Sequence, residues 1–253
     1  MSEMGVQAVV EAAPGLTQWQ RVTNIFTAPS KTFEDVKRGN RSWWMPLIII
    51  SVATYLFFAV VSTKIGLQQA VDNQTHLSAK AEERMAQATP EQREMGAKIG
   101  LYITEGIFIA NPALTLGMGA LISLGLWGTI NFIFGGRAKF GGILCVWLYS
   151  TLPALVKTLL SIVTIYAGMA PESFNMKNPA PTNIGAFLNP LETNAALYSL
   201  ATSLDAVEIW SMALLAIGLA TVAGVKRSAG YIAVFGWWAI IVLFGAGIAA
   251  ITG

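Results

Sequence analysis

The chain has 253 residues, of which 54% are hydrophobic and 12% are charged. Ordinary soluble domains contain about 25% charged residues, so this chain cannot cover a core with a conventional water-facing surface. The net charge of +2 is small and its residues are scattered, which excludes a nucleic-acid-binding surface. The one cysteine, Cys145, lies within an apolar stretch, and therefore no intramolecular disulfide can form.

Residues 1–42 form a tail without the uninterrupted apolar core of a signal peptide. Apolar residues recur in the tail near helical spacing, at Val22, Ile25, Phe26, Phe33 and Val36. Most of the charged residues between them face elsewhere, and Pro29 is placed to start a helix. We expect an amphipathic helix that lies along the cytoplasmic membrane interface, with a solvated linker as the alternative.

Five apolar stretches of about 20 residues follow the tail. They are Trp43 to Ser62, Pro112 to Phe134, Ile143 to Gly168, Asp205 to Val225 and Ala229 to Ile251. At a rise of 1.5 Å per residue, each helix could cross about 30 Å of hydrocarbon. Lipid offers the backbone no hydrogen-bond partners, and the chain lacks the alternating segments of a barrel. Residues 43–253 are therefore predicted to form an all-α, polytopic membrane domain with five transmembrane helices.

The loop between the first two stretches is expected to be helical. Leu77 to Ala88 is rich in Ala, Lys, Glu and Met, and Thr89-Pro90-Glu91-Gln92 resembles a helix start with a capping box. The Asn111-Pro112 pair should then kink the path before the second stretch. The later loop, which contains four prolines, is expected to be irregular.

Lysine and arginine gather in the connections on one side of the predicted bundle. They are Arg21, Lys31, Lys37, Arg38, Arg41, Arg137, Lys139, Lys226 and Arg227. Acidic residues outnumber basic ones in the two remaining loops. The positive-inside rule therefore predicts a cytoplasmic N-terminus and an extracytoplasmic C-terminus.

Three ionisable residues within or beside the apolar stretches form a candidate intramembrane polar cluster, namely Lys157, Asp205 and Glu208. Charges in hydrocarbon are costly and often mark functional sites. We expect an interhelical contact between Lys157 and Glu208. Two alternatives stay open: an outward-snorkelling lysine with two interfacial acids, or a proton or substrate relay.

Small residues recur every four positions in the fourth stretch, at Ala216, Ala220 and Gly224. This spacing predicts a helix-packing seam. The same spacing would serve a homo-oligomer, so it does not decide between packing within the bundle and packing between copies.

The chain lacks the usual signatures of catalysis. It has no phosphate-binding glycine loop, no cysteine cluster and no paired histidines, since His76 is its one histidine. Nothing places serine, aspartate and histidine together as a triad. We therefore expect a protein that is not an enzyme and holds no cofactor or metal.

Several segments, taken as an ordered set, resemble the bacterial branch of the Yip1 domain family. They are the run from Phe26 to Val36 with Trp43 and Trp44, the run from Phe134 to Phe140, Tyr149-Ser150-Thr151-Leu152-Pro153, Trp210 with Gly218-Leu219, and Lys226-Arg227-Ser228-Ala229. The resemblance implies a five-helix membrane bundle with a cytoplasmic N-terminus, here in a bacterial inner membrane. The Asp-Leu-Tyr-Gly-Pro motif of eukaryotic relatives, which are implicated in vesicle traffic and GTPase association, is absent.

Some bacterial relatives look like accessory proteins beside export transporters, including transporters that handle antimicrobial peptides. The leading hypothesis is therefore a non-enzymatic membrane scaffold or transporter-accessory protein, acting in membrane organisation or in export and defence. Its partners would be the lipid bilayer and a membrane protein such as an ABC-type exporter. The alternative is a small permease with a polar path around Lys157, Asp205 and Glu208.

Overall fold

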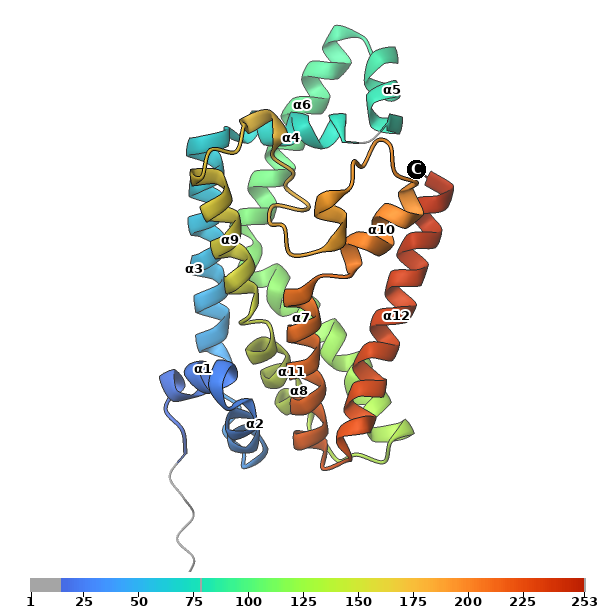
Figure 1. The fold of residues 1–253 in the computed structure, drawn as a ribbon. Coiled ribbons are helices and arrows are strands. Elements are labelled where there is room, and N and C mark those ends of the chain that lie inside the picture. Colours follow the sequence, from blue (N-terminus) through green and yellow to red (C-terminus); the bar gives the residue numbers. More distant parts are fainter. Residues whose placement is uncertain (1–14, 78, 253) are drawn as a thin grey trace, which may run out of the picture.

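The computed structural model describes residues 15–77 and 79–252, and its regular elements over these residues are helices (Figure 1). The α-helices are α1 (Gln18–Thr27), α2 (Pro29–Lys37), α3 (Trp44–Val60), α4 (Leu67–His76), α5 (Ala79–Gln87), α6 (Pro90–Ile109), α7 (Asn111–Gly128), α8 (Phe140–Ser150), α9 (Ala154–Tyr166), α10 (Ala195–Ser203), α11 (Ala206–Ala223) and α12 (Arg227–Thr252). Two π-helical turns, η1 (Val61–Ile65) and η2 (Thr129–Ile133), extend α3 and α7. Two 3-10 turns, η3 (Pro171–Ser173) and η4 (Ile184–Phe187), lie between α9 and α10.

Five helical stretches are long and apolar enough to cross a membrane, which confirms the predicted architecture. They are Trp44–Ile65, Asn111–Ile133, Phe140–Tyr166, Ala206–Ala223 and Arg227–Ile251, and each boundary lies within three residues of the prediction. Large apolar side chains such as Ile240, Phe244 and Ile248 of α12 are exposed. In a bilayer such side chains face lipid, so the chain is a multi-pass membrane protein.

The third stretch was predicted as one continuous helix, and this was wrong. It consists of α8 and α9, separated by a turn at residues 151–153. Pro153 has no N–H to donate and its ring would crowd the carbonyl four residues earlier, so the α-helix cannot pass through it. Around the break, hydrogen bonds that span three residues replace the α-helical pattern, as from Leu152 N to Tyr149 O (3.2 Å) and from Val156 N to Pro153 O (2.9 Å).

The loop between α3 and α7 is helical, as expected. At the start of α6, Gln92 N donates to Thr89 Oγ1 (3.3 Å) and Thr89 N donates to Gln92 Oε1 (2.9 Å), which is the predicted capping box. A break at Ala110 separates α6 from α7 beside Pro112. Two helices were not anticipated: α4, and α10 in the proline-rich loop, where Asn194 caps α10 and the helix packs against α12.

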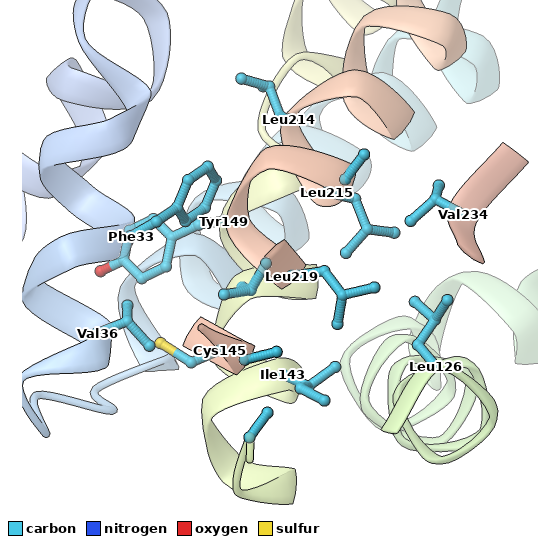
Figure 2. Close-up of a cluster of buried hydrophobic side chains, with 14 of the residues drawn as sticks. Phe33, Val36, Leu126, Ile143, Cys145, Tyr149, Leu214, Leu215, Leu219 and Val234 are labelled. Carbon is cyan, nitrogen blue, oxygen red and sulfur yellow. The ribbon is translucent and has the colours of Figure 1, made fainter. Parts of the chain in front are cut away.

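The apolar face of the tail helices α1 and α2 belongs to the main hydrophobic core. Phe33 and Val36 are fully or almost fully buried, and Figure 2 shows them directed from α2 toward Tyr149 and Cys145 of α8. A methyl group added at Gly218 of α11 would lie 2.9 Å from the Phe33 ring, so α2 sits directly on α11. The tail is amphipathic as predicted. Its apolar face packs against the helix bundle, whereas we expected it to lie on the membrane interface. The packing therefore continues across the predicted boundary at residue 42.

We call the end of the bundle that carries α2 the α2 end (lower end in Figure 1). The turns at residues 134–139 and 224–226 lie at this end, whereas α4, α5, α10 and the last turn of α12 lie at the other. The core in Figure 2 occupies the α2 end and includes Leu126, Leu219 and Val234 from three membrane helices.

The α11–α12 contact uses part of the predicted small-residue seam. Ala216 and Ala220 are buried, and a methyl group at Gly230 of α12 would overlap the Ala216 carbonyl oxygen and lie 3.0 Å from Ala220 Cβ. Gly224 was wrongly assigned to the seam. It adopts φ 70° and ends α11 in the left-handed conformation, and no atom lies within 4 Å of a methyl group placed there. Glycine is needed at that position for the backbone turn.

We expect Gly230→Ala to destabilise the bundle by about 1–3 kcal/mol, because the added methyl meets backbone atoms of α11 that cannot move aside. Gly236→Ala, in the same helix, is the matched control. Apart from the backbone of α12 and the two neighbouring residues, no atom lies within 4 Å of its added methyl, so alanine should raise stability by up to about 1 kcal/mol. Thermal unfolding in detergent measures both. Equal effects of the two substitutions would show that α11 and α12 do not pack closely at Gly230.

Candidate functional site

The structure brings Lys157, Asp205 and Glu208 together. The Lys157 ammonium lies 2.8 Å from Asp205 Oδ2 and 3.2 Å from Glu208 Oε1. The break at Pro153 starts α9 just before Lys157, while Asp205 is the N-cap of α11 and Glu208 lies in its first turn. The expected contact between Lys157 and Glu208 is present, and the shorter contact is to Asp205.

Asp205 is the most completely engaged member of this cluster, and its side chain is fully buried. Its Oδ1 accepts the backbone N–H groups of Val207 (2.9 Å) and Glu208 (3.1 Å), so it caps α11. Its Oδ2 accepts hydrogen bonds from Lys157 Nζ and from the Thr182 hydroxyl (2.5 Å). Burial disfavours the charged carboxylate, but the hydrogen bonds from Lys157, Thr182 and the backbone outweigh it and lower the pKa of Asp205 to about 2.

The cluster also fixes the irregular loop that precedes α10. Ala206 N donates to Thr182 O (3.0 Å), and Asn183 pairs with Asp205 in an isolated antiparallel bridge. Non-helical backbone beside apolar spans must find its partners within the protein. Asp205 therefore joins α9, α11 and this loop.

The chemistry available to the cluster is limited by this pairing. Lys157 neutralises one of the two carboxylates, and one carboxylate is also committed to capping a helix. A pocket of about 270 Å³ lies nearby, lined by Thr164, Met169, Pro181 and Tyr198 among others, and none of the three charged residues lines it. Among the described residues, no group of three His, Cys, Asp or Glu side chains could hold a metal ion.

A second buried polar cluster, at the α2 end, was missed by the sequence analysis. Arg21 is fully buried, and its Nε lies 2.9 Å from Asp35 Oδ2, an ion pair without the alignment of a hydrogen bond. Its other nitrogens donate to the carbonyl of Ser42 (2.8 Å) and to the carbonyl of Asn40. The guanidinium also lies 5.1 Å from the centre of the Tyr149 ring.

This Arg21 cluster locks the tail helices onto α8. The Tyr149 hydroxyl donates to Gln18 Oε1 of α1 (2.9 Å), and the Thr32 hydroxyl of α2 donates to the Arg21 carbonyl (2.9 Å). In the sequence, Arg21 contributes only to the positive charge that predicts the orientation. One signal was available: Arg21 lies four positions before Ile25, on the apolar face of the predicted helix.

One of the comparisons with known proteins gives a match. A family model described as the Yip1 domain matches residues 23–249, from the middle of α1 to the last turns of α12. The matched range includes Asp35, Tyr149 and all of the cluster around Lys157. No curated protein and no solved structure shows a significant match to the chain.

Neutralising Asp205 should destabilise the bundle more than neutralising Glu208. Asp205→Asn removes a buried charged acceptor of Lys157, at a cost of about 1.5–3 kcal/mol. The Glu208 side chain is 56% exposed, so Glu208→Gln should cost about 1 kcal/mol or less. Thermal unfolding in detergent measures both, and the reverse order would contradict the assignment of Asp205 as the main partner.

The pairing itself can be isolated with the double variant Lys157→Met with Asp205→Asn. If the two side chains interact, the double variant loses less stability than the sum of the single variants. Coupling between polar pairs in membranes averages about 0.6 kcal/mol, so the cycle needs replicate measurements. Strict additivity would show that the pair contributes no coupling.

The one cysteine reports on the docking of the tail, because Cys145 is fully buried beneath α2. Asp35→Ala leaves Arg21 buried without its counter-ion, which costs about 3–5 kcal/mol and should release α1 and α2. We therefore expect N-ethylmaleimide to label Cys145 much faster in Asp35→Ala than in the unchanged chain. Glu34→Ala, at an exposed neighbouring acid, is the control and should leave labelling slow. Equal rates for the two variants would mean that the ion pair does not hold the tail.

Proposed function

Because the chain belongs to the Yip1 domain family, we propose that it is a non-enzymatic membrane scaffold or transporter-accessory protein. The observation that carries the proposal is the internal pairing of its buried charges. Arg21 is held by Asp35 and backbone carbonyls, and Lys157 by Asp205 and Glu208. Side chains engaged in this way join helices. A catalytic group, in contrast, must be free to reach a substrate.

The proposed setting is a bacterial inner membrane with a cytoplasmic N-terminus and an extracytoplasmic C-terminus. The supporting argument is the gathering of exposed lysine and arginine side chains at the α2 end, as the positive-inside rule requires. The proposed partner is a membrane protein of the exporter type, as the family resemblance implies. It would meet a rigid platform, since α1 and α2 pack on α8 and α11.

A small permease is the second candidate. It is supported by the partial exposure of the paired side chains, 22% for Lys157 and 56% for Glu208. A solute path that used these groups would depend on their charge. A scaffold would not, provided that the fold persists.

The two functions are separated by comparing the unchanged chain with Glu208→Gln. Proteins captured from native membranes by cross-linking should include one membrane protein in constant ratio to the chain, and Glu208→Gln should capture it equally well. Solute flux into proteoliposomes should be absent from both. Flux that Glu208→Gln abolishes, without a constant partner, would overturn the scaffold proposal in favour of the permease.

The orientation is tested by two matched serine-to-cysteine changes in a Cys145→Ala background. Ser228 lies at the α2 end and Ser173 at the opposite end, and both residues are exposed. We expect an impermeant maleimide to label Ser228→Cys only from the cytoplasm and Ser173→Cys only from outside. The opposite pattern would reverse the proposed topology.

A further inference from the structure

Eight exposed basic side chains gather at the α2 end. They are Lys31, Lys37, Arg38, Arg41, Arg137, Lys139, Lys226 and Arg227. Within the described segments that carry them, Glu34 is the one exposed acid. The ion pairs formed by the described residues use none of these eight side chains. This end of the bundle therefore has an excess of positive charge that the protein does not neutralise.

Two of these basic segments are held rigidly beside each other. Arg137 N donates to the Ala223 carbonyl at the end of α11 (3.1 Å). Asn131 fixes the same turn, since its Oδ1 accepts Ala138 N (2.9 Å) and its Nδ2 donates to Ala138 O (3.0 Å). The turn at residues 134–139 and the turn at residues 224–226 thus form one surface.

A pocket of about 500 Å³ lies between these two turns. It is lined by the polar side chains of Lys226 and Ser228 and by the apolar side chains of Phe134, Val225 and Ile232, among others. Large aromatic side chains, Trp44 and Phe132, are exposed at the same end of the bundle. Exposed aromatic rings are typical of the level where lipid headgroups meet acyl chains.

We propose that this pocket binds the headgroup of an anionic phospholipid. Lys226 and the Ser228 hydroxyl can donate to the phosphate oxygens, while Phe134 and Ile232 line the pocket where the acyl chains begin. The other seven cations select a headgroup with net negative charge over a zwitterionic one, since each basic side chain near a bilayer attracts anionic lipid. The protein is thereby a selective binder of the lipid that surrounds it.

Native mass spectrometry of the full chain in detergent tests this site, with phosphatidylglycerol and phosphatidylcholine as probes. We expect phosphatidylglycerol to bind more tightly. Lys226→Gln should weaken its binding about fivefold, the effect of about one lost cation near the headgroup. Lys177→Gln, at an exposed lysine of the opposite end, is the control and should leave binding unchanged. Lys37→Gln lies in the basic surface but outside the pocket, and it should weaken binding less than Lys226→Gln.

Equal binding of the two lipids would overturn the proposal. Equal losses in Lys226→Gln and Lys37→Gln would overturn the pocket as the binding site, because a diffuse charged surface would then be sufficient. Glycerol phosphate, which carries the phosphate without acyl chains, should not displace phosphatidylglycerol at the same concentration. Displacement would show a site for free phosphate. The proposed scaffold function could fail while this result holds, because none of these measurements involves a partner protein.

Discussion

Lipid offers no hydrogen-bond partner to a free backbone group, and the structure meets this constraint at three interruptions of its helices. At the break between α6 and α7, the Tyr55 hydroxyl donates to the Ile109 carbonyl (3.1 Å). At the break between α8 and α9, short turns across Pro153 join the two helices. Where α11 begins, the Asp205 carboxylate accepts the first free N–H groups. At these three interruptions the protein itself supplies the hydrogen-bond partner.

The same constraint explains why each buried charged side chain binds several segments of the protein at once. Asp205 caps α11 and, with its second oxygen, reaches α9 and the loop before α10. Arg21 uses the planar fork of its guanidinium to reach a carboxylate and two backbone carbonyls at once. Lys157 of α9 carries a compact ammonium charge, and it binds the carboxylates of Asp205 and Glu208. Both clusters connect segments that are distant in sequence, so charge in this protein supplies connectivity between apolar helices.

The membrane spans could be predicted from the sequence because length and hydropathy are local properties, and the capping box at Thr89 depends only on a four-residue pattern. The features that the sequence did not predict depend on contacts between distant residues or on patterns with two possible readings. Gly224 fits the spacing of a packing seam as well as that of a helix end, and only its backbone angle decides. Buried Arg21 contacts Tyr149, which lies 128 residues away. The shorter contact of Lys157 is to Asp205, which also binds Thr182 of a loop that has no readable sequence pattern.

The docked tail has a consequence for how the protein is made. Helices α1 and α2 are synthesised before α11, which completes the binding surface of the tail about 190 residues later. At a synthesis rate of about 5–20 residues per second, the tail waits roughly 10–40 s before its apolar face can be covered. The contact between Phe33 of α2 and Gly218 of α11 is thus one that cannot form until the fourth membrane span has been synthesised.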